Sequence, residues 1–248
     1  MFSILVIAGL GYLGYRVSKR APRARRGLFS FQTYVPQSEA VTPATRAVVH
    51  GEQGEAAVRS ELRRVLSALC GENFHLYDGA VLIHHAPGTA FPTAEIDHIA
   101  VTPFGIFVIE TKNWSGAITP GPSRDEVSRT GIDGVTEARR SPLAQNRTKV
   151  DFLIAKLPAL WPIESLGVFA SPDCTLDPRL PLPIIHVSEL ALWMRLRLND
   201  FRESGKKPVN VSGAWEAIML TASINAFELE EHRKRLRAHP KDRANNAV

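Results

Sequence analysis

Cysteine is scarce in this chain of 248 residues. The two cysteines, Cys70 and Cys174, are too few for a disulfide scaffold, and such low usage is typical of a reducing compartment. No Cys/His group has the spacing of a zinc site, and the sequence has no Gly-x-Ser-x-Gly elbow for a serine nucleophile. Internal repeats are also absent. The sequence therefore argues against a disulfide-rich module, a zinc finger and a serine hydrolase of the elbow type.

An apolar run stands at the N-terminus. Residues 2–17 carry no charge except Arg16, and six basic residues lie between Arg16 and Arg26 inclusive. These sixteen residues fall just short of the roughly 17–25 of a membrane-spanning helix, although Arg16 can snorkel. In a secretory signal peptide the basic residues precede the apolar run, whereas here they follow it. By the positive-inside rule, the rest of the chain would then stay in the cytoplasm. We expect a single-pass anchor in the inner (cytoplasmic) membrane; a cytoplasmic protein with a buried strand or peripheral segment there is the alternative.

The same run contains a second pattern, Gly9-x-Gly11-x-x-Gly14, after an apolar stretch. This satisfies the first part of the dinucleotide-binding fingerprint. The fingerprint also needs an acidic residue about 20 positions further on, at the end of a second strand. Residues 23–35 contain no acidic residue. A nucleotide site is therefore disfavoured.

Two carboxylates are brought together by a predicted hairpin. Residues 99–108 read as two apolar strands joined by a tight Pro/Phe turn at the centre. Counting outward from that turn places Asp97 opposite Glu110, where Cβ atoms lie about 4.5–5.5 Å apart. Like charges so placed repel unless a cation lies between them, and a divalent metal is the natural occupant. Lys112, on the same face as Glu110, adds a second positive group. A solvated hairpin end without a metal remains the alternative.

A third carboxylate lies on a predicted helix over about residues 48–70. Apolar residues recur there at helical spacing, and Glu55 lies three positions before Val58 and seven before Leu62. Glu55 should therefore face the core from the first turn. A carboxylate there costs several kcal/mol unless it is paired, hydrogen-bonded or metal-bound, and the helix dipole relieves part of that cost. The alternative is an N-terminal glutamate that points to solvent.

Four short blocks follow one another along the chain. They are Gly51-Glu52-x-Gly54-Glu55, Glu95-Ile96-Asp97-His98, Gly105-Ile106-Phe107-Val108-Ile109-Glu110-Thr111-Lys112-Asn113-Trp114-x-Gly116 and Pro142-Leu143-x-Gln145-Asn146. Together they resemble the nuclease-related domain (NERD) family of the PD-(D/E)XK nuclease superfamily, over about residues 48–195. The resemblance implies an α/β fold with a restriction-endonuclease-like core, in which helices flank a central mixed β-sheet. One departure is a missing tryptophan between the last two blocks: Val127 or a neighbour stands in its place, which affects the predicted shape of the substrate groove.

The resemblance also implies a catalytic site of five residues. Asp97, Glu110 and Lys112 form the signature, Glu55 is the helical acid, and Gln145 matches a later polar position. Mg²⁺, or Mn²⁺ in its place, would be bound by Asp97 and Glu110, with Glu55 acting directly or through water. Lys112 would orient the attacking water or stabilise the developing charge. We expect a Mg²⁺-dependent nuclease acting on DNA, or on RNA. A catalytically silent nucleic-acid-binding or membrane-associated scaffolding module with this fold is the alternative.

Composition is compatible with nucleic acid as the partner, since the net charge is +5 and the pI about 9.4. A basic cluster that would bind phosphates consists of Arg139, Arg140, Arg147 and Lys149, and an ordinary basic surface is its alternative. The charged run at 230–237 is expected to be a solvated helical face rather than a DNA clamp. A homodimer is a further expectation, since nucleases that cut both strands often act as dimers.

We expect four parts along the chain: a membrane anchor (1–17), a basic linker (18–47), a nuclease-like domain (48–195) and a C-terminal helical appendage with a charged tail (196–248). Further expected elements are a strand at 76–83, a variable loop at 119–140, a helix at about 143–157, strands at 166–170 and 184–187, and one helix at 211–236. The apolar stripe expected on the 143–157 helix is Leu143, Val150, Ile154 and Leu157. Gln145 lies off this stripe, so a solvent-facing glutamine is its alternative.

Overall fold

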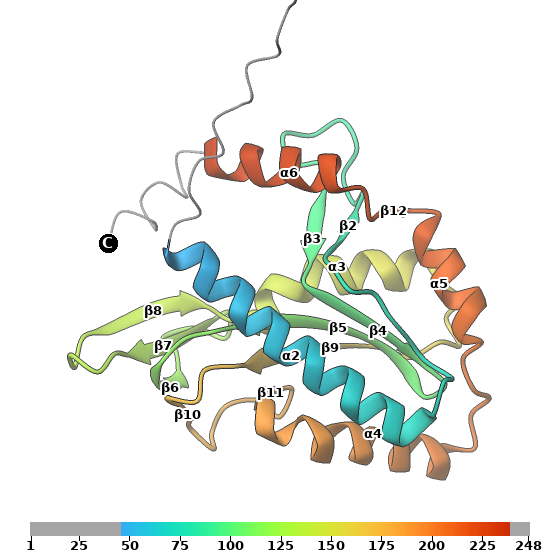
Figure 1. Ribbon diagram of the computed structural model, residues 1–248, viewed down its shortest axis with the longest axis horizontal. Coiled ribbons are helices and arrows are strands. Elements are labelled where there is room, and N and C mark those ends of the chain that lie inside the picture. Colours follow the sequence, from blue (N-terminus) through green and yellow to red (C-terminus); the bar gives the residue numbers. More distant parts are fainter. Residues whose placement is uncertain (1–45, 239–248) are drawn as a thin grey trace, which may run out of the picture. The chain divides into compact units, whose positions relative to one another are not determined.

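A five-stranded sheet forms the centre of the protein in a computed structural model that describes residues 46–238 (Figure 1). Its strands, in spatial order, are β1 (His75–Leu76), β4 (His98–Thr102), β5 (Gly105–Lys112), β9 (Ile163–Phe169) and β11 (Ile184–His186). β1, β4 and β5 pair antiparallel, whereas β5, β9 and β11 pair parallel. The central sheet is therefore mixed, as predicted.

Helices cover both faces of this sheet. One face carries α2 (Arg46–Cys70) and α4 (Leu190–Ser204), and the other carries α3 (Pro142–Lys156) and α5 (Val211–Met219). A 3₁₀ turn, η1 (Val187–Glu189), precedes α4. The prediction of an α/β fold with a mixed sheet flanked by helices is confirmed.

β5 lies in the middle of these layers and is buried from its first residue through its seventh. Its side chains alternate between the two faces. Phe107 and Ile109 belong to the core beneath α2 and α4, and Ile106 and Val108 belong to the core beneath α3 and α5. A strand covered on both faces reads as a nearly continuous apolar run, which explains the sequence of β5.

The predicted hairpin register is confirmed. Thr102 pairs with Gly105, and the ladder continues outward to the pair His98–Ile109. The paired ladder of β4 ends at His98, so Asp97 lies at the break between β3 (Ala94–Ile96) and β4. The site acid is thus placed where one strand ends and the chain changes sheet.

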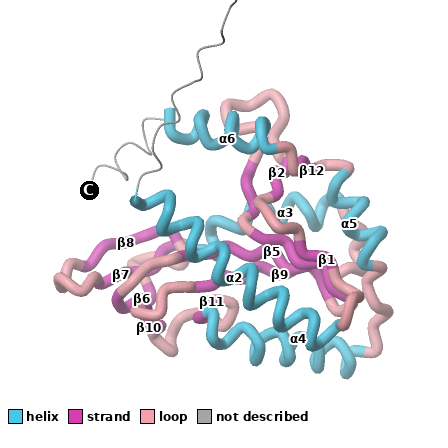
Figure 2. Tube along the Cα trace, viewed as in Figure 1, coloured by secondary structure: helices cyan, strands magenta, loops and turns pink. Residues whose placement is uncertain are grey.

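Two smaller sheets flank the central one. The first has the order β10 (Cys174–Leu176), β6 (Gly116–Pro120), β7 (Glu126–Thr130) and β8 (Thr136–Arg140), and the second has the order β12 (Ala222–Ser223), β2 (Val81–Ile83) and β3. Figure 2 shows β6, β7 and β8 as a sheet at the opposite end of the long central strands from α5. The prediction of a variable loop over 119–140 is therefore wrong, because most of this segment pairs as strands. Val127, where a tryptophan was expected, is only 2% exposed and packs in a small core with Ile118 and Phe169.

Two other predicted elements are each divided. The expected strand at 76–83 breaks at Asp78-Gly79, a turn-forming pair, and its two halves join different sheets. The expected helix at 211–236 is likewise two helices, α5 and α6 (Ala226–Ala238), separated by β12. Asn225 accepts hydrogen bonds from the backbone N–H groups of Phe227 and Glu228, so it caps the start of α6.

The predicted anchor, most of the linker and the glycine fingerprint all precede Arg46 and lie outside the described residues. Between Arg46 and Ala238, no helix is both long and apolar enough to cross a membrane. The described residues belong to one compact unit. The predicted boundary at 195/196 falls within α4, and α5 packs against the central sheet.

Candidate active site

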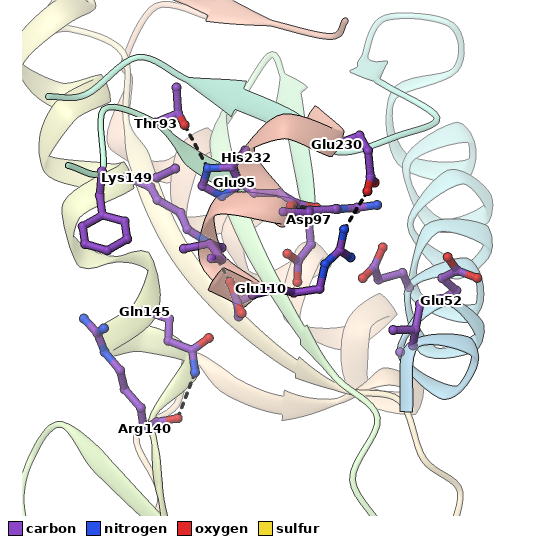
Figure 3. Close-up of a pocket in the computed structure, with 18 residues that line it drawn as sticks. Glu52, Thr93, Glu95, Asp97, Glu110, Arg140, Gln145, Lys149, Glu230 and His232 are labelled. Atoms are coloured by element: carbon purple, nitrogen blue, oxygen red, sulfur yellow. Dashed lines mark hydrogen bonds and ion pairs between the residues drawn. The ribbon is translucent and has the colours of Figure 1, made fainter. Parts of the chain in front are cut away.

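A pocket of about 630 Å³ opens beside the ends of β3 and β5. Figure 3 shows Asp97 and Glu110 at its centre, Glu52 of α2 on one side, Arg140 and Gln145 on the other, and His232 of α6 above them. Its acidic lining residues are Glu52, Glu55, Glu95, Asp97, Glu110 and Glu230, and its basic ones, histidine aside, are Arg140, Lys149, Arg233 and Arg237. The pocket is thus rich in carboxylate oxygens, which can bind a cation, and basic side chains surround them.

Asp97 and Glu110 form the floor of the pocket. The Asp97 Oδ2 atom accepts a hydrogen bond of 2.8 Å from the backbone N–H of Thr111, which holds this carboxyl beside Glu110. Burial raises the pKa of Asp97 to about 7, and the negative charge of Glu110 adds to the increase. The structure therefore brings the two predicted carboxylates together, and full ionisation of both near neutral pH requires additional positive charge.

Two lysines contact Glu110, which is only 6% exposed. The Lys112 Nζ atom donates to Glu110 Oε1 at 2.7 Å, and the Lys149 Nζ atom donates to Oε2 at 2.6 Å. Burial alone would raise the pKa of Glu110, but the two ammonium groups outweigh it and hold that pKa below its ordinary value. Glu110 is therefore a carboxylate with both oxygens paired.

Gln145 faces the site. Its Oε1 atom accepts from Lys112 Nζ at 2.9 Å, and its Nε2 atom donates to the Arg140 carbonyl at 3.1 Å. Pro142 begins α3 and the Ser141 side chain caps it, which places Gln145 in the first turn beside β5. Gln145 could have faced either the site or solvent, and the structure directs its side chain toward the site.

The predicted apolar stripe of α3 is wrong in part. Ile154 is 54% exposed, whereas the buried face of the helix includes Asn146, Lys149 and Leu153. The Asn146 Nδ2 atom donates to the Val108 carbonyl at 2.9 Å. Polar residues on a buried face do not stand out in an apolar pattern. Lys149 is consequently not the surface phosphate ligand that was predicted, because it is buried against Glu110.

Glu55 lines the same pocket from α2 and is half-buried. Burial raises its pKa, and the charge of Glu95 adds to that effect. The predicted position in the first turn is wrong: α2 begins at Arg46, so Glu55 lies in its third turn, beyond the reach of the helix dipole. Within residues 46–238, no three His, Cys, Asp or Glu side chains are arranged so that they could hold a metal ion.

The approach of α2 to β5 depends on a glycine. A Cβ atom at Gly54 would lie 2.6 Å from the Cβ of Asn113, just after β5. The Asn113 Nδ2 atom in turn donates to the His50 carbonyl of α2 at 2.7 Å. Glycine at 54 therefore permits the close contact that brings Glu55 to the end of the strand.

Comparison with known families agrees with this geometry: the model of the nuclease-related domain (NERD) matches residues 50–170. This part of the chain is thus similar to a nuclease-related domain. The matched region of the NERD domain contains Glu55, Asp97, Glu110, Lys112 and Gln145, while α4, α5 and α6 lie beyond it. No curated protein and no solved structure matches the chain.

The other predicted phosphate ligands of the NERD domain differ in position. Arg140 lines the pocket and donates to the Ala144 carbonyl at 3.0 Å. Arg139 and Arg147 do not line it, because they pair with Glu137 and Asp125. The charged run at 230–237 is not simply a solvated face, since His232 is 5% exposed and α6 borders the pocket.

Sequence reasoning missed Lys149 as a partner of Glu110. A signal was present, since Lys149 follows Gln145 by four positions and so shares its side of a helix. It also missed Arg233, which pairs with Glu95 across a separation of 138 residues. No local pattern could have revealed that contact.

Proposed function

We propose that this protein is a metal-dependent nuclease that hydrolyses phosphodiester bonds in nucleic acid, with DNA as the first candidate and RNA as the second. The NERD match supports a nuclease-related function. One observation carries the proposal: Asp97, Glu110 and Gln145 line one pocket, and Lys112 bridges Glu110 and Gln145, so four predicted catalytic residues lie together. The mixed sheet flanked by helices is compatible with a restriction-endonuclease-like core.

The donor set of the pocket fits Mg²⁺, or Mn²⁺ in its place. Both are hard ions that prefer carboxylate and water oxygens, and Asp97 and Glu110 offer such oxygens beside each other. Burial, and then the charge of Glu110, raise the pKa of Asp97, and a divalent cation bound between the two carboxylates would oppose both effects. Asp97 and Glu110 would hold the ion, with Glu55 acting through a water. When bound, it would acidify a water and neutralise charge on the phosphate.

Lys112 is the residue we assign to the developing negative charge. Its ammonium group is held by Glu110 and Gln145 at 2.7 and 2.9 Å, so it is already in place before substrate binds. A fixed cation that needs no reorganisation is most effective where charge develops in the transition state. Gln145 is then a positioning residue, because it acts by orienting Lys112.

Lys149 serves the same site from the buried side. Its contact with Glu110 Oε2 keeps that carboxylate ionised inside the protein. We assign to Lys149 the role of a structural counter-ion rather than a contact to substrate, since it is only 7% exposed.

Cleavage assays on the purified full-length chain test the proposal. Plasmid, oligodeoxynucleotide and oligoribonucleotide substrates are incubated with Mg²⁺, with Mn²⁺ or with EDTA. We expect cleavage only with metal, its loss in Asp97→Asn, and a decrease of about 10²–10³-fold in Lys112→Gln. Asp151→Asn, an exposed acid on α3 outside the pocket, is the matched control and should cleave normally.

Two outcomes would contradict this function. Cleavage that persists unchanged in both Asp97→Asn and Lys112→Gln would refute the assigned site. Binding of nucleic acid without cleavage, for every metal and substrate, would favour the non-catalytic binding module instead.

We also propose that residues 1–17 tether the domain to the cytoplasmic face of the inner membrane. The apolar run and the basic residues that follow it support this proposal. Full-length protein should sediment with membranes and resist extraction by carbonate, and deletion of residues 1–17 should release it. Equal release of both forms would contradict the tether.

A further inference from the structure

Helix α6 lies well beyond the matched NERD region yet forms one wall of its pocket (Figure 3). Glu230, His232, Arg233, Leu236 and Arg237 are its lining residues. The exposed Lys234 and Arg235 of the same helix do not line the pocket. Of the four lysines and arginines of α6, two therefore line the pocket and two do not.

The position of α6 is fixed by contacts close to the catalytic acids. His232 Nδ1 and Thr93 Oγ1 form a buried hydrogen bond of 2.8 Å, and Arg233 pairs with Glu95. Thr93 immediately precedes β3, Glu95 lies on it, and that strand leads directly into Asp97. At its other end, α6 follows β12, which pairs with β2, the neighbour of β3. The helix is thus held against the segment that carries the site.

Arg233 and Arg237 retain hydrogen-bond donors for a ligand. Arg233 uses Nε and Nη2 to bind Glu95, which leaves Nη1 out of those bonds, and its side chain is 37% exposed. Arg237, at 56% exposure, donates through Nη2 to Glu230, which is itself 49% exposed. A guanidinium group has five N–H donors in a fork that matches phosphate oxygens. An exposed ion pair is weak, so a phosphate can replace the carboxylate partner of Arg237.

The dimensions of the pocket restrict the form of the nucleic acid. A cube of its volume would be about 9 Å on a side, whereas the major groove of B-DNA alone is about 12 Å wide. Pockets of roughly 300–1,000 Å³ hold ligands of small-molecule size. The volume of the pocket therefore favours one polynucleotide strand over an intact duplex as its occupant.

We propose that α6 is a substrate-binding element, in which Arg233 and Arg237 bind backbone phosphates of a single polynucleotide strand next to the phosphodiester that is cut. This inference rests on the proposed function and adds to it the substrate form and a region outside the NERD match. Arg140, on the opposite side of the pocket, contacts the same strand. Base identity is not read by these contacts, because phosphates are common to all sequences.

Salt-dependent binding tests this assignment without requiring cleavage. Fluorescence anisotropy is measured in EDTA with the full-length chain, using labelled single-stranded DNA and RNA of one sequence and the corresponding duplexes. Each arginine that neutralises one phosphate should contribute about 0.7 to the slope of log K against log[salt] on a single strand. We expect Arg237→Gln and Arg233→Gln each to lower the slope by about 0.7 and to weaken binding about fivefold at 0.1 M salt.

Arg235→Gln is the matched control, because it removes the same charge from an exposed position of α6 that does not line the pocket. It should retain the wild-type slope. Arg233→Lys keeps the charge and should restore the slope that Arg233→Gln loses. Arg233→Gln removes the arginine that pairs with Glu95, which can disturb folding. Arg237 is exposed, so Arg237→Gln should fold normally in either case.

Three results would overturn the inference. They are equal slopes for Arg237→Gln, Arg235→Gln and wild type, tighter binding of duplex than of single strand, and no binding of any nucleic acid. The proposed function fails separately: if wild type binds as described but never cleaves, the binding role of α6 stands without catalysis. If the wild type cleaves nucleic acid but all variants have the same salt-dependence slope, only the proposed role of α6 fails.

Discussion

Glu110 shows most clearly how single residues determine this site. It is buried, and each carboxylate oxygen receives one ammonium group, from Lys112 and from Lys149. A buried carboxylate is tolerated only when it is paired or hydrogen-bonded. The two lysines differ in their surroundings: Lys112 also contacts Gln145, whereas Lys149 is only 7% exposed and pairs with Glu110 from the buried side.

Removal of the buried counter-ion should destabilise the fold. Lys149→Met leaves Glu110 with only Lys112, and breaking a buried ion pair costs about 3–5 kcal/mol. We expect the free energy of unfolding, measured with urea, to fall by about that amount. Lys156→Met, which removes an exposed lysine from the same helix, should change it by less than about 1 kcal/mol. Equal effects of the two substitutions would show that Lys149 is not a buried counter-ion.

The raised pKa of Asp97 predicts a specific pH dependence of stability. Its folded pKa of about 7 exceeds the ordinary value of 3.8 that applies in the unfolded chain, so the folded state binds the extra proton. This contribution to stability is complete below about pH 4 and is lost as the pH rises through 7. Asp97→Asn stays neutral, so the variant should become more stable relative to wild type as pH rises from 5 to 8.

Urea unfolding in EDTA at pH 5 and pH 8 measures that difference. Asp151→Asn, an exposed acid, serves as the comparison and should show no such trend. A stability difference between Asp97→Asn and wild type that does not vary with pH would contradict the raised pKa.

At the scale of elements, the contact between α2 and β5 makes a prediction about two glycines. Gly54→Ala places a methyl group 2.6 Å from the Asn113 Cβ, whereas Gly51 has nothing within 4 Å of the same atom. Alanine favours a helix by roughly 0.5–1 kcal/mol over glycine, but overpacking costs about 1–3 kcal/mol. Gly51→Ala should therefore stabilise the protein, and Gly54→Ala should destabilise it and lower the rate of cleavage.

Thermal unfolding and cleavage rates of the two variants check this expectation. The two changes in the free energy of unfolding should have opposite signs. If both alanines stabilise the protein equally, α2 does not approach β5 as closely as the structure shows.

Elements with regular apolar patterns could be predicted from the sequence, and those with polar buried faces could not. The β4–β5 register followed from a tight turn and strict apolar pairing, and it placed Asp97 beside Glu110. The orientation of α3 did not follow, because its inner face carries Asn146 and Lys149. The Asn146 Nδ2 and Lys149 Nζ donors bond to partners on β5 that are distant in sequence.

The breaks in the chain were equally hard to anticipate. Asp78-Gly79 and Asn225 are short turn and cap signals inside segments that otherwise read as one strand or one helix. After Asp78-Gly79 the chain enters the small sheet formed by β12, β2 and β3, and just before Asn225 it leaves that sheet. That sheet exists only through pairing between distant segments, and a local pattern does not contain it.

For the whole molecule, the consequence is that the C-terminal part completes the site. One chain connection and two strand pairings link α6 to the strand before Asp97: α6 follows β12, β12 pairs with β2, and β2 pairs with β3. The NERD match covers the acids and Lys112, but the wall with Arg233 and Arg237 lies outside it. Proteins that share the matched region but differ after it would then differ in which substrate they admit.

This arrangement predicts that α6 and the site are coupled. Thr93→Val removes the hydroxyl that pairs with His232 while preserving side-chain shape, and it leaves a buried imidazole nitrogen without its partner. We expect a loss of about 1–3 kcal/mol in the free energy of unfolding and faster amide hydrogen exchange in α6. Unchanged exchange in α6 would contradict this anchoring role.

Calorimetric titration of Mg²⁺ or Mn²⁺ into the full-length protein tests the central claim most directly, with a non-cleavable single-stranded oligonucleotide present. Asp97 and Glu110 should take up a divalent ion, and Asp97→Asn and Glu110→Gln should each abolish its heat of binding. Circular dichroism confirms that the proteins are folded. Absence of metal binding by the folded wild type, with the oligonucleotide bound, would contradict the account.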